Sequence, residues 1–288
     1  MNNEMYGTNN ASDGGLNKLL AGTKDFMNSN SIISNFVFII LVLIVFLVVL
    51  QMSIQAITYY FKPSGNPKLI DGMVSTSNQL EITQNPYDGT GPLLRSVNER
   101  EGLEFSWSSW IYINTLKGTS TLEYQHVYSK GSNTSVDVSG IALPNNGPGV
   151  YLKSDTNELR IVMDTFDESN NSMNEHVEID NIPMKKWVHV VVMCKNRYMD
   201  VYINGDLSKR KVLINVPQQN YGNTFVGLNG GYDGYLSNLW YYNYALSVRE
   251  IRRLFYKGPN MKMKGSMELK KKDYLSLNWF INSSSEAD

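Results

Sequence analysis

The chain has 288 residues, with 42% hydrophobic and 18% charged side chains, and its formal net charge is −1 with a sequence pI near 6.3. This balance argues against a nucleic-acid partner for the body of the protein, because such partners are bound through concentrated Lys and Arg. A single cysteine, Cys194, excludes an internal disulfide and favours the reducing side of a membrane.

An apolar run dominates the N-terminal part of the chain. Residues 36–50 are an unbroken series of Phe, Val, Ile and Leu, with further apolar residues on either side. Such a run favours bilayer insertion by ~5–9 kcal/mol, and about 20 residues cross the hydrocarbon. We expect residues 32–54 to form one transmembrane helix. A buried core helix would carry a polar residue within four turns, and a cleaved signal peptide would have a shorter polar leader.

The sequence divides into five parts. We expect a disordered polar segment at 1–31, the transmembrane helix at 32–54, a juxtamembrane linker at 55–68, one β-sandwich domain at 69–258 and a basic C-terminal extension at 259–288. Lysines lie close to both ends of the span, so the positive-inside rule leaves its orientation open. The lysine-rich extension is read as a solvated tail or as a contact for anionic headgroups.

The middle of the chain has the pattern of strands. Residues 103–114 alternate, with Leu103, Phe105, Trp107, Ile111 and Ile113 on one face and Trp110 and Tyr112 on the other. Shorter strands are predicted at 123–128, 149–152, 158–163, 176–179 and 224–227, and a loop is predicted at 144–148. Little room remains for crossover helices, so the fold class is all-β.

Two consecutive strands are predicted at 187–194 and 198–205. The first is apolar on nearly every residue, as expected of a strand with both faces covered. The second alternates, with Met199, Val201 and Ile203 on one side. Asn204 and Gly205 then supply residues that accept positive φ in a tight turn. This is an antiparallel meander.

The segment 234–258 predicts a strand followed by a short helix. Ser247 and Glu250 have the spacing of a capping box, and Ile251, Leu254 and Phe255 share one helical face. Gly258 and Pro259 end the helix.

These segments together resemble the concanavalin A-like lectin/glucanase superfamily, in its laminin-G-like branch. The resemblance covers roughly residues 69–258 and implies a jelly-roll β-sandwich. It is carried by matching positions of the final strands and the helix start: Trp187, His189, Val190, Val201, Tyr202, Asn204, Gly205, Gly234, Leu236, Tyr242, Asn243, Ala245, Leu246, Ser247, Glu250 and Ile251. The order of leader, span and sandwich also looks like the membrane-anchored lectin-fold proteins of large DNA viruses, which implies a virion or membrane component with capsid or other membrane proteins as partners.

The glucanases of this superfamily use carboxylates aligned on one strand as nucleophile and acid/base. Glu178 and Asp180 resemble the beginning of that motif, but no second glutamate follows. We therefore expect a protein that is not an enzyme. The three histidines have no ligand spacing, and His189 and Cys194 are five residues apart on one strand, so they face opposite sides.

A calcium site is the one metal site that the sequence suggests. Legume-type lectins hold calcium with an Asp-Thr-aromatic segment, and residues 163–170 look similar, although the later ligand spacing differs. Asp164, Asp167, Glu168 and Asn170 supply oxygen ligands of the kind that Ca²⁺ prefers. The alternative is an acidic, solvated loop.

A glycan site is suggested by the Gly-rich loop 229–235. Sugar binding needs an aromatic ring to stack on and planar hydrogen-bonding groups, which Asn229, Tyr232, Asp233 and Tyr235 supply. The alternative is that the glycines permit a tight turn and the tyrosines cover the edge of the sandwich.

Three functions remain open for this chain. It is a membrane-anchored structural or adhesive protein whose sandwich contacts proteins, a glycan-binding lectin used for attachment, or a glycoside hydrolase of the glucanase type.

Overall fold

The computed structural model describes residues 22, 24, 32–61, 64–84, 93–97, 99–100, 102–118, 122–132, 135–169 and 171–264. The predictions for most of residues 1–31, for Asn170 and for the extension beyond residue 264 lie outside these ranges. The chain divides into two units, residues 1–62 and residues 63–288, which are taken separately below.

The first unit contains the long helix α2 (Ile32–Phe61). Its side chains from residue 35 to residue 60 are apolar enough, over sufficient length, to cross a membrane. Two of its hydroxyl groups bond within the helix, since Ser53 Oγ donates to Val49 O and Thr58 Oγ1 to Ile54 O, each at 2.8 Å. The helix continues past the expected end at residue 54, so residues 55–61 are helical rather than a linker.

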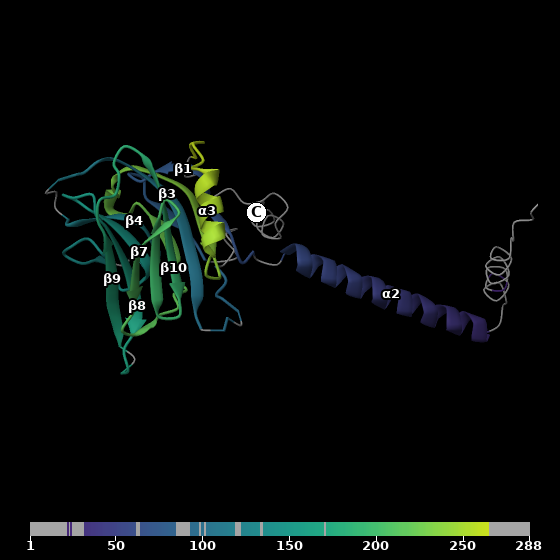
Figure 1. The fold of residues 1–288 in the computed structure, drawn as a ribbon. Helices are drawn as coiled ribbons and strands as arrows, with labels where there is room; N and C mark the ends of the chain where they lie inside the picture. Colours follow the sequence, from purple (N-terminus) through teal and green to yellow (C-terminus); the bar gives the residue numbers. More distant parts are fainter. Residues whose placement is uncertain are drawn as a thin grey trace, which may run out of the picture. The chain divides into compact units, whose positions relative to one another are not determined.

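The second unit is an antiparallel β-sandwich (Figure 1). One sheet has six strands in the order β1 (Lys68–Ser75), β15 (Asp233–Tyr242), β3 (Glu104–Thr115), β10 (Trp187–Lys195), β11 (Tyr198–Ile203) and β12 (Asp206–Val212). We call it sheet A. All of its neighbouring strands pair antiparallel.

The facing sheet, sheet B, has seven strands. Its order is β13 (Val216–Pro217), β8 (Leu159–Phe166), β7 (Asn146–Lys153), β4 (Tyr124–Gly131), β14 (Asn223–Val226) and β2 (Leu80–Ile82), with β9 (Ser172–Ile179) also paired to β8. A separate pair, β5 (Ser135–Val136) and β6 (Ala142–Leu143), completes the strands. The all-β sandwich is therefore confirmed. The predicted loop at 144–148 is wrong in part, because β7 already begins at Asn146 and pairs there with Gly131.

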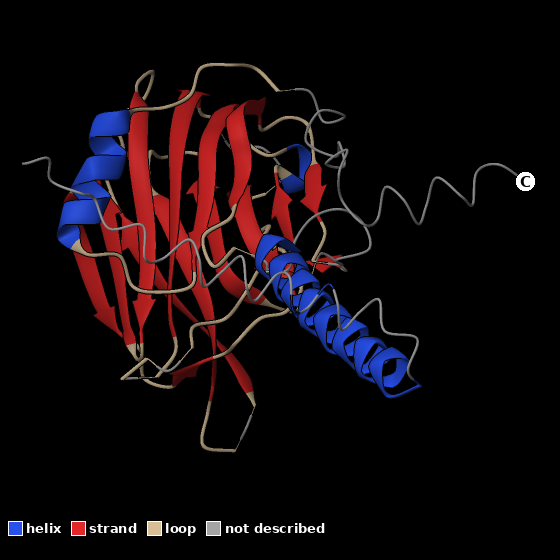
Figure 2. Ribbon diagram, turned by 90° about the vertical axis from the view of Figure 1, so that its right-hand side faces the viewer, coloured by secondary structure: helices blue, strands red, loops and turns tan. Residues whose placement is uncertain are grey.

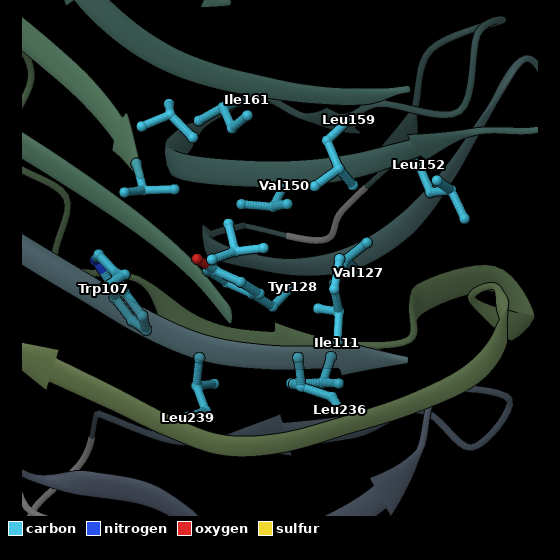
Figure 3. Packing of buried hydrophobic residues seen from close by; sticks show 14 of the residues in the cluster. Trp107, Ile111, Val127, Tyr128, Val150, Leu152, Leu159, Ile161, Leu236 and Leu239 are labelled. Atoms are coloured by element: carbon cyan, nitrogen blue, oxygen red, sulfur yellow. The ribbon is translucent and has the colours of Figure 1, made fainter. Parts of the chain in front are cut away.

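The core lies between the two sheets (Figure 3). Trp107 of β3 has no exposed surface, and its indole stacks on Tyr128 of β4 with ring centroids 5.7 Å apart. Phe105, Ile111 and Ile113 point into the same core, as the alternation predicts. Burial of apolar surface at ~25 cal/mol per Å² makes this contact between sheets the main source of stability.

The outer face of sheet A is covered by α3 (Val248–Lys257) (Figure 2). Val191 and Met193 of β10 pack here against Ile251, with Leu254 beside them. Both faces of β10 are therefore buried, as its continuous apolar sequence indicates. The capping box is confirmed, since Ser247 Oγ accepts from Glu250 N and Glu250 Oε2 accepts from Ser247 N.

The sandwich reaches further along the chain at both ends than residues 69–258. Pro67 O accepts from Tyr241 N at 3.1 Å, and Lys68 is the first residue of β1. Beyond α3, Met73 N donates to Lys262 O and Lys264 N donates to Met73 O, each at 2.8 Å. Residues 260–264 of the expected tail therefore run along β1 as part of the sandwich.

Candidate functional site

The Gly-rich loop follows β14 and contains the short 3-10 helix η2 (Leu228–Gly230). Gly227 and Asn229 have φ of 65° and 54°, which explains the Gly and Asn at these positions. A Cβ at Gly234 would overlap the Tyr112 carbonyl oxygen and the Tyr232 ring, so the glycine of the family motif is needed for close packing.

Tyr232 does not stack on a ligand, which corrects the prediction for this residue. Its side chain is 0% exposed and belongs to the core between the sheets. Its hydroxyl donates to Tyr235 O at 2.7 Å, and burial raises its pKa far above the ordinary value. Tyr232 therefore has a structural role in packing the sandwich, as in the alternative interpretation of this loop.

The other three glycan candidates lie in different surroundings. Asp233 Oδ2 accepts from Asn114 Nδ2 at 3.1 Å and from Thr115 Oγ1, which ties β15 to the end of β3. Tyr235 is half-buried on the outer face of sheet A, with its ring centroid 6.2 Å from that of Tyr112. Asn229 is exposed.

Asn229 lies at a pocket of about 230 Å³, which we call the loop pocket. Lys117 crosses its rim, where Nζ donates to Gly230 O at 3.0 Å and Gly231 O at 2.7 Å. His126 is buried beneath it; burial lowers its pKa to about 3, and its Nδ1 accepts from Leu228 N at 3.2 Å. Tyr124, the one aromatic phenol in the described lining, is buried and covered by Arg160. The loop pocket therefore offers hydrogen bonds but no open stacking ring.

The calcium candidates are not gathered into a site by the described residues. Asp164 is 1% exposed, and its Oδ2 accepts from Asn146 N at 2.6 Å. Asp167 accepts from Asn171 N at 2.7 Å at the turn after β8, and Glu168 is exposed beside it. In the part of the chain that the structure describes, no three His, Cys, Asp or Glu side chains lie where they could hold a metal ion.

Glu178 is the residue that resembles the first carboxylate of the glucanase motif. It forms an ion pair with Arg160, and this contact lowers its pKa. His176 Nε2 is 3.8 Å away from the same carboxylate oxygen. A carboxylate held ionised by a guanidinium is a poor proton donor, and Asp180 is exposed in the residue after β9.

A second pocket, which sequence reasoning missed, lies between the outer face of sheet A and the end of α3. Its volume is about 320 Å³, and we call it the tryptophan groove. Its lining includes Lys68, Trp110, Asn238, Trp240, Lys257 and Asn260. Trp110 is buried at its base, whereas the side chain of Trp240 is only partly buried.

Polar groups surround the Trp240 ring. Lys68 Nζ is 5.3 Å from its centroid, and Tyr242 stacks beside it at 5.9 Å with planes 14° apart. Asn238 Nδ2 donates to Gly258 O at 3.3 Å, while its buried Oδ1 has no hydrogen-bond partner among the described residues. Asn260 donates through Nδ2 to Asp71 Oδ1 at 3.1 Å. The groove thus combines one ring with two amides and an ammonium group.

A β-bulge produces this arrangement. Asn238 has φ of 51°, and the pairing register of β15 with β3 shifts between Ser237 and Trp240. Leu236 and Leu239 both enter the core, so the strand needs an extra residue between them, and Trp240 then returns to the outer face. Two buried leucines three residues apart in a strand are the sequence signal that could have revealed the bulge.

Comparison with known protein families gives one match. Residues 88–252 match the model of the concanavalin A-like lectin/glucanases superfamily, Laminin_G_3. None of the curated proteins matches the chain.

Solved structures with a similar fold include botulinum neurotoxin binding domains. The domain of neurotoxin DC in complex with SialylT has 20% identity and a TM-score of 0.41, over 54% of this chain and 35% of that one. The serotype D binding domain has 14% identity and a TM-score of 0.46, over 67% and 42%. A structure that concerns the cell entry of botulinum neurotoxin type C, described as dependent upon interaction with two ganglioside molecules, has 18% identity and a TM-score of 0.43. The match covers 64% of this chain and 42% of that one. The chain spans less than half the length of these structures, and the likeness concerns the fold alone.

Proposed function

The chain belongs to the concanavalin A-like lectin/glucanases superfamily, and we propose that its sandwich binds a glycan in the tryptophan groove while α2 anchors it in a membrane. The observation that carries the proposal is the partly buried indole of Trp240 in the lining of the groove, together with amides and an ammonium group.

This constellation has the chemistry that a sugar requires. The apolar C–H face of a pyranose packs on an aromatic ring, and its hydroxyls need planar donors and acceptors. The amides of Asn238 and Asn260 line the groove, and Lys68 Nζ adds a cation beside the ring.

We propose binding without catalysis. A retaining glycosidase needs two carboxyl groups ~5–5.5 Å apart, one of them protonated. Glu178 is engaged by Arg160 on sheet B, and the groove lining contains no carboxylate among the described residues.

Membrane anchoring rests on the length and composition of α2. A helix of 30 residues is ~45 Å long, close to the full thickness of a bilayer with its headgroups. Its apolar side chains are exposed from Ile32 to Tyr60, which water would disfavour and lipid would not.

The test is a glycan array probed with the full chain in nanodiscs. We expect saturable binding that Trp240→Ala weakens ~10-fold or more, because stacking and ring burial are lost. Tyr221→Ala is the matched control, since this exposed tyrosine lies outside the groove. Tyr235→Ala tests the glycan site that the sequence predicts in the loop 229–235. Glycan binding that survives Trp240→Ala unchanged, or no binding at all, would contradict the proposal.

A second candidate function is protein contact, favoured by one apolar strip. Val212, Ile214 and Val216 are all exposed, Ile214 by 75%, whereas the intervening Leu213 is buried. Exposed aliphatic strips of this kind mark protein interfaces more often than sugar sites. In the virion setting that the resemblance implies, the partner would be a capsid or membrane protein.

Ile214→Asp combined with Val216→Asp tests this second candidate. We expect the full chain to lose a co-purifying protein or its own self-association, with folding retained because both side chains are outside the core. An unchanged set of partners by quantitative mass spectrometry after mild crosslinking would reject it.

A further inference from the structure

The outer face of α3 is a basic surface that neither the fold nor the tryptophan groove uses. The helix sequence VREIRRLFYK contains four basic residues and one acidic residue, in a chain whose net charge is −1. At 100° per residue, Val248, Arg252, Tyr256, Arg249 and Arg253 occupy one continuous arc. All five are exposed, Tyr256 by 82%, and they line a shallow depression together. We call this arc the basic face.

The opposite side of the helix holds the basic face in a fixed orientation. Ile251 is buried against sheet A, and the Phe255 ring stacks on Trp110 with centroids 5.8 Å apart. The capping box at Ser247 fixes the first turn. The arginines are therefore presented outward by a helix that is packed against sheet A.

Nearby acids neutralise little of this charge. Arg252 pairs with Asp206 Oδ1 at 3.2 Å, but both side chains are largely exposed, and such pairs contribute little in water. Glu250 is committed to Ser247 and to the Tyr244 hydroxyl, which donates to it at 3.1 Å. Arg249 and Arg253 have no ion pair with the described acidic residues.

The segment that enters the sandwich pairs with the strand that precedes α3. Gly65 O accepts from Asn243 N at 3.1 Å, and Pro67 O accepts from Tyr241 N, so the chain enters the sandwich beside the end of β15. Residue 248, the first of α3, follows shortly after that strand end. In sequence, residues 62 and 63 alone separate α2 from this entry segment.

We propose that the basic face of α3 docks on the anionic surface of the bilayer that holds α2. The inference rests on the proposed anchoring. Guanidinium groups bind lipid phosphates and carboxylates, and Val248 and Tyr256 supply the apolar and interfacial contacts between them. Docking restricts the rotation of the sandwich on its stalk and so sets which face, and which ligands, the groove can reach.

A fluorescent label at position 256 tests the docking. The full chain carrying Tyr256→Cys is placed in nanodiscs of phosphatidylcholine alone or mixed with phosphatidylserine; Cys194 is buried and stays unlabelled. We expect headgroup spin-labelled lipid to quench the probe only in the anionic nanodiscs, and salt to reverse this. Adding Arg249→Gln, Arg252→Gln and Arg253→Gln should reduce the docking equilibrium ~100-fold, since each arginine near the surface contributes about fivefold.

Matched controls separate the possible outcomes. A label at Tyr221→Cys should show no lipid-dependent quenching, and near-UV circular dichroism confirms folding of the triple variant. Nanodisc incorporation is measured separately, so a failure of anchoring is distinguished from a failure of docking. Equal quenching in both kinds of nanodisc, or no quenching in either, would overturn the proposal. Binding of the basic face to an oligonucleotide instead of anionic lipid would overturn it as well.

Discussion

The indole of Trp110 stacks on the ring of Phe255, with centroids 5.8 Å apart and planes 14° from parallel. The imidazole of His189 lies 5.0 Å from the same indole. These three rings join β3, β10 and α3, and they position both the tryptophan groove and the basic face.

Phe255→Ala should therefore loosen α3 from sheet A. Because Phe255 is partly buried, we expect a loss of ~2 kcal/mol in the free energy of unfolding, below the range for a fully buried ring. Tyr256→Ala, on the exposed face of the same helix, should cost less than ~0.5 kcal/mol. Denaturant unfolding of the two variants measures the difference, and equal effects would show that the stack does not hold the helix.

Asp164 should make the protein less stable as the pH rises. Burial raises the pKa of its carboxyl to about 7 from 3.8, and its Oδ1 has no hydrogen-bond partner among the described residues. A raised folded-state pKa means that the folded protein binds the extra proton between pH 3.8 and 7, so stability falls as pH rises through this window.

Asp164→Asn removes this titration. The stability of the variant relative to wild type should increase between pH 5 and pH 8, by roughly 1–3 kcal/mol. Unfolding curves at the two pH values provide the measurement. A difference that stays constant with pH would mean that Asp164 is ionised throughout.

His189 should have the opposite pH dependence. Burial lowers its pKa to about 4 from 6.5, and Ser108 Oγ shares a hydrogen bond of 2.8 Å with Nε2. The unfolded chain binds the proton first, so this group's contribution is complete above pH 6.5 and declines as the pH falls toward 4.

In His189→Gln, the slope of unfolding free energy against pH between 4 and 6.5 should be shallower, by up to ~1.4 kcal/mol per pH unit. His176→Gln is the control, because that half-exposed imidazole should change the slope less. Identical slopes for wild type and His189→Gln would show that His189 is protonated within the fold.

Local patterns predicted much of the fold correctly. The alternation of residues 103–114 places Phe105 and Trp107 in the core and Trp110 on the outer face, and Asn204 and Gly205 form a turn with φ of 53° and 90°. These features depend on residues near one another in sequence, where side-chain period and backbone preference are decisive.

The candidate site was predicted less well, because it depends on which strands become neighbours. Tyr232 and Tyr235 look equivalent in the sequence, yet one closes the core and the other lies outside it. That difference comes from the packing of the loop against β1 and β3, where Thr76 Oγ1 donates to Tyr232 O at 2.7 Å.

By itself, the sequence determined an apolar span, an all-β sandwich and a capped final helix, because each is written in a periodicity or a spacing of nearby residues. The tertiary structure alone decided that Trp240, Asn238 and Lys68 share a groove and that the arginines of α3 face outward. The bulge at Asn238 and the stack of Phe255 on Trp110 arise from contacts between segments more than a hundred residues apart in sequence, which no local pattern encodes.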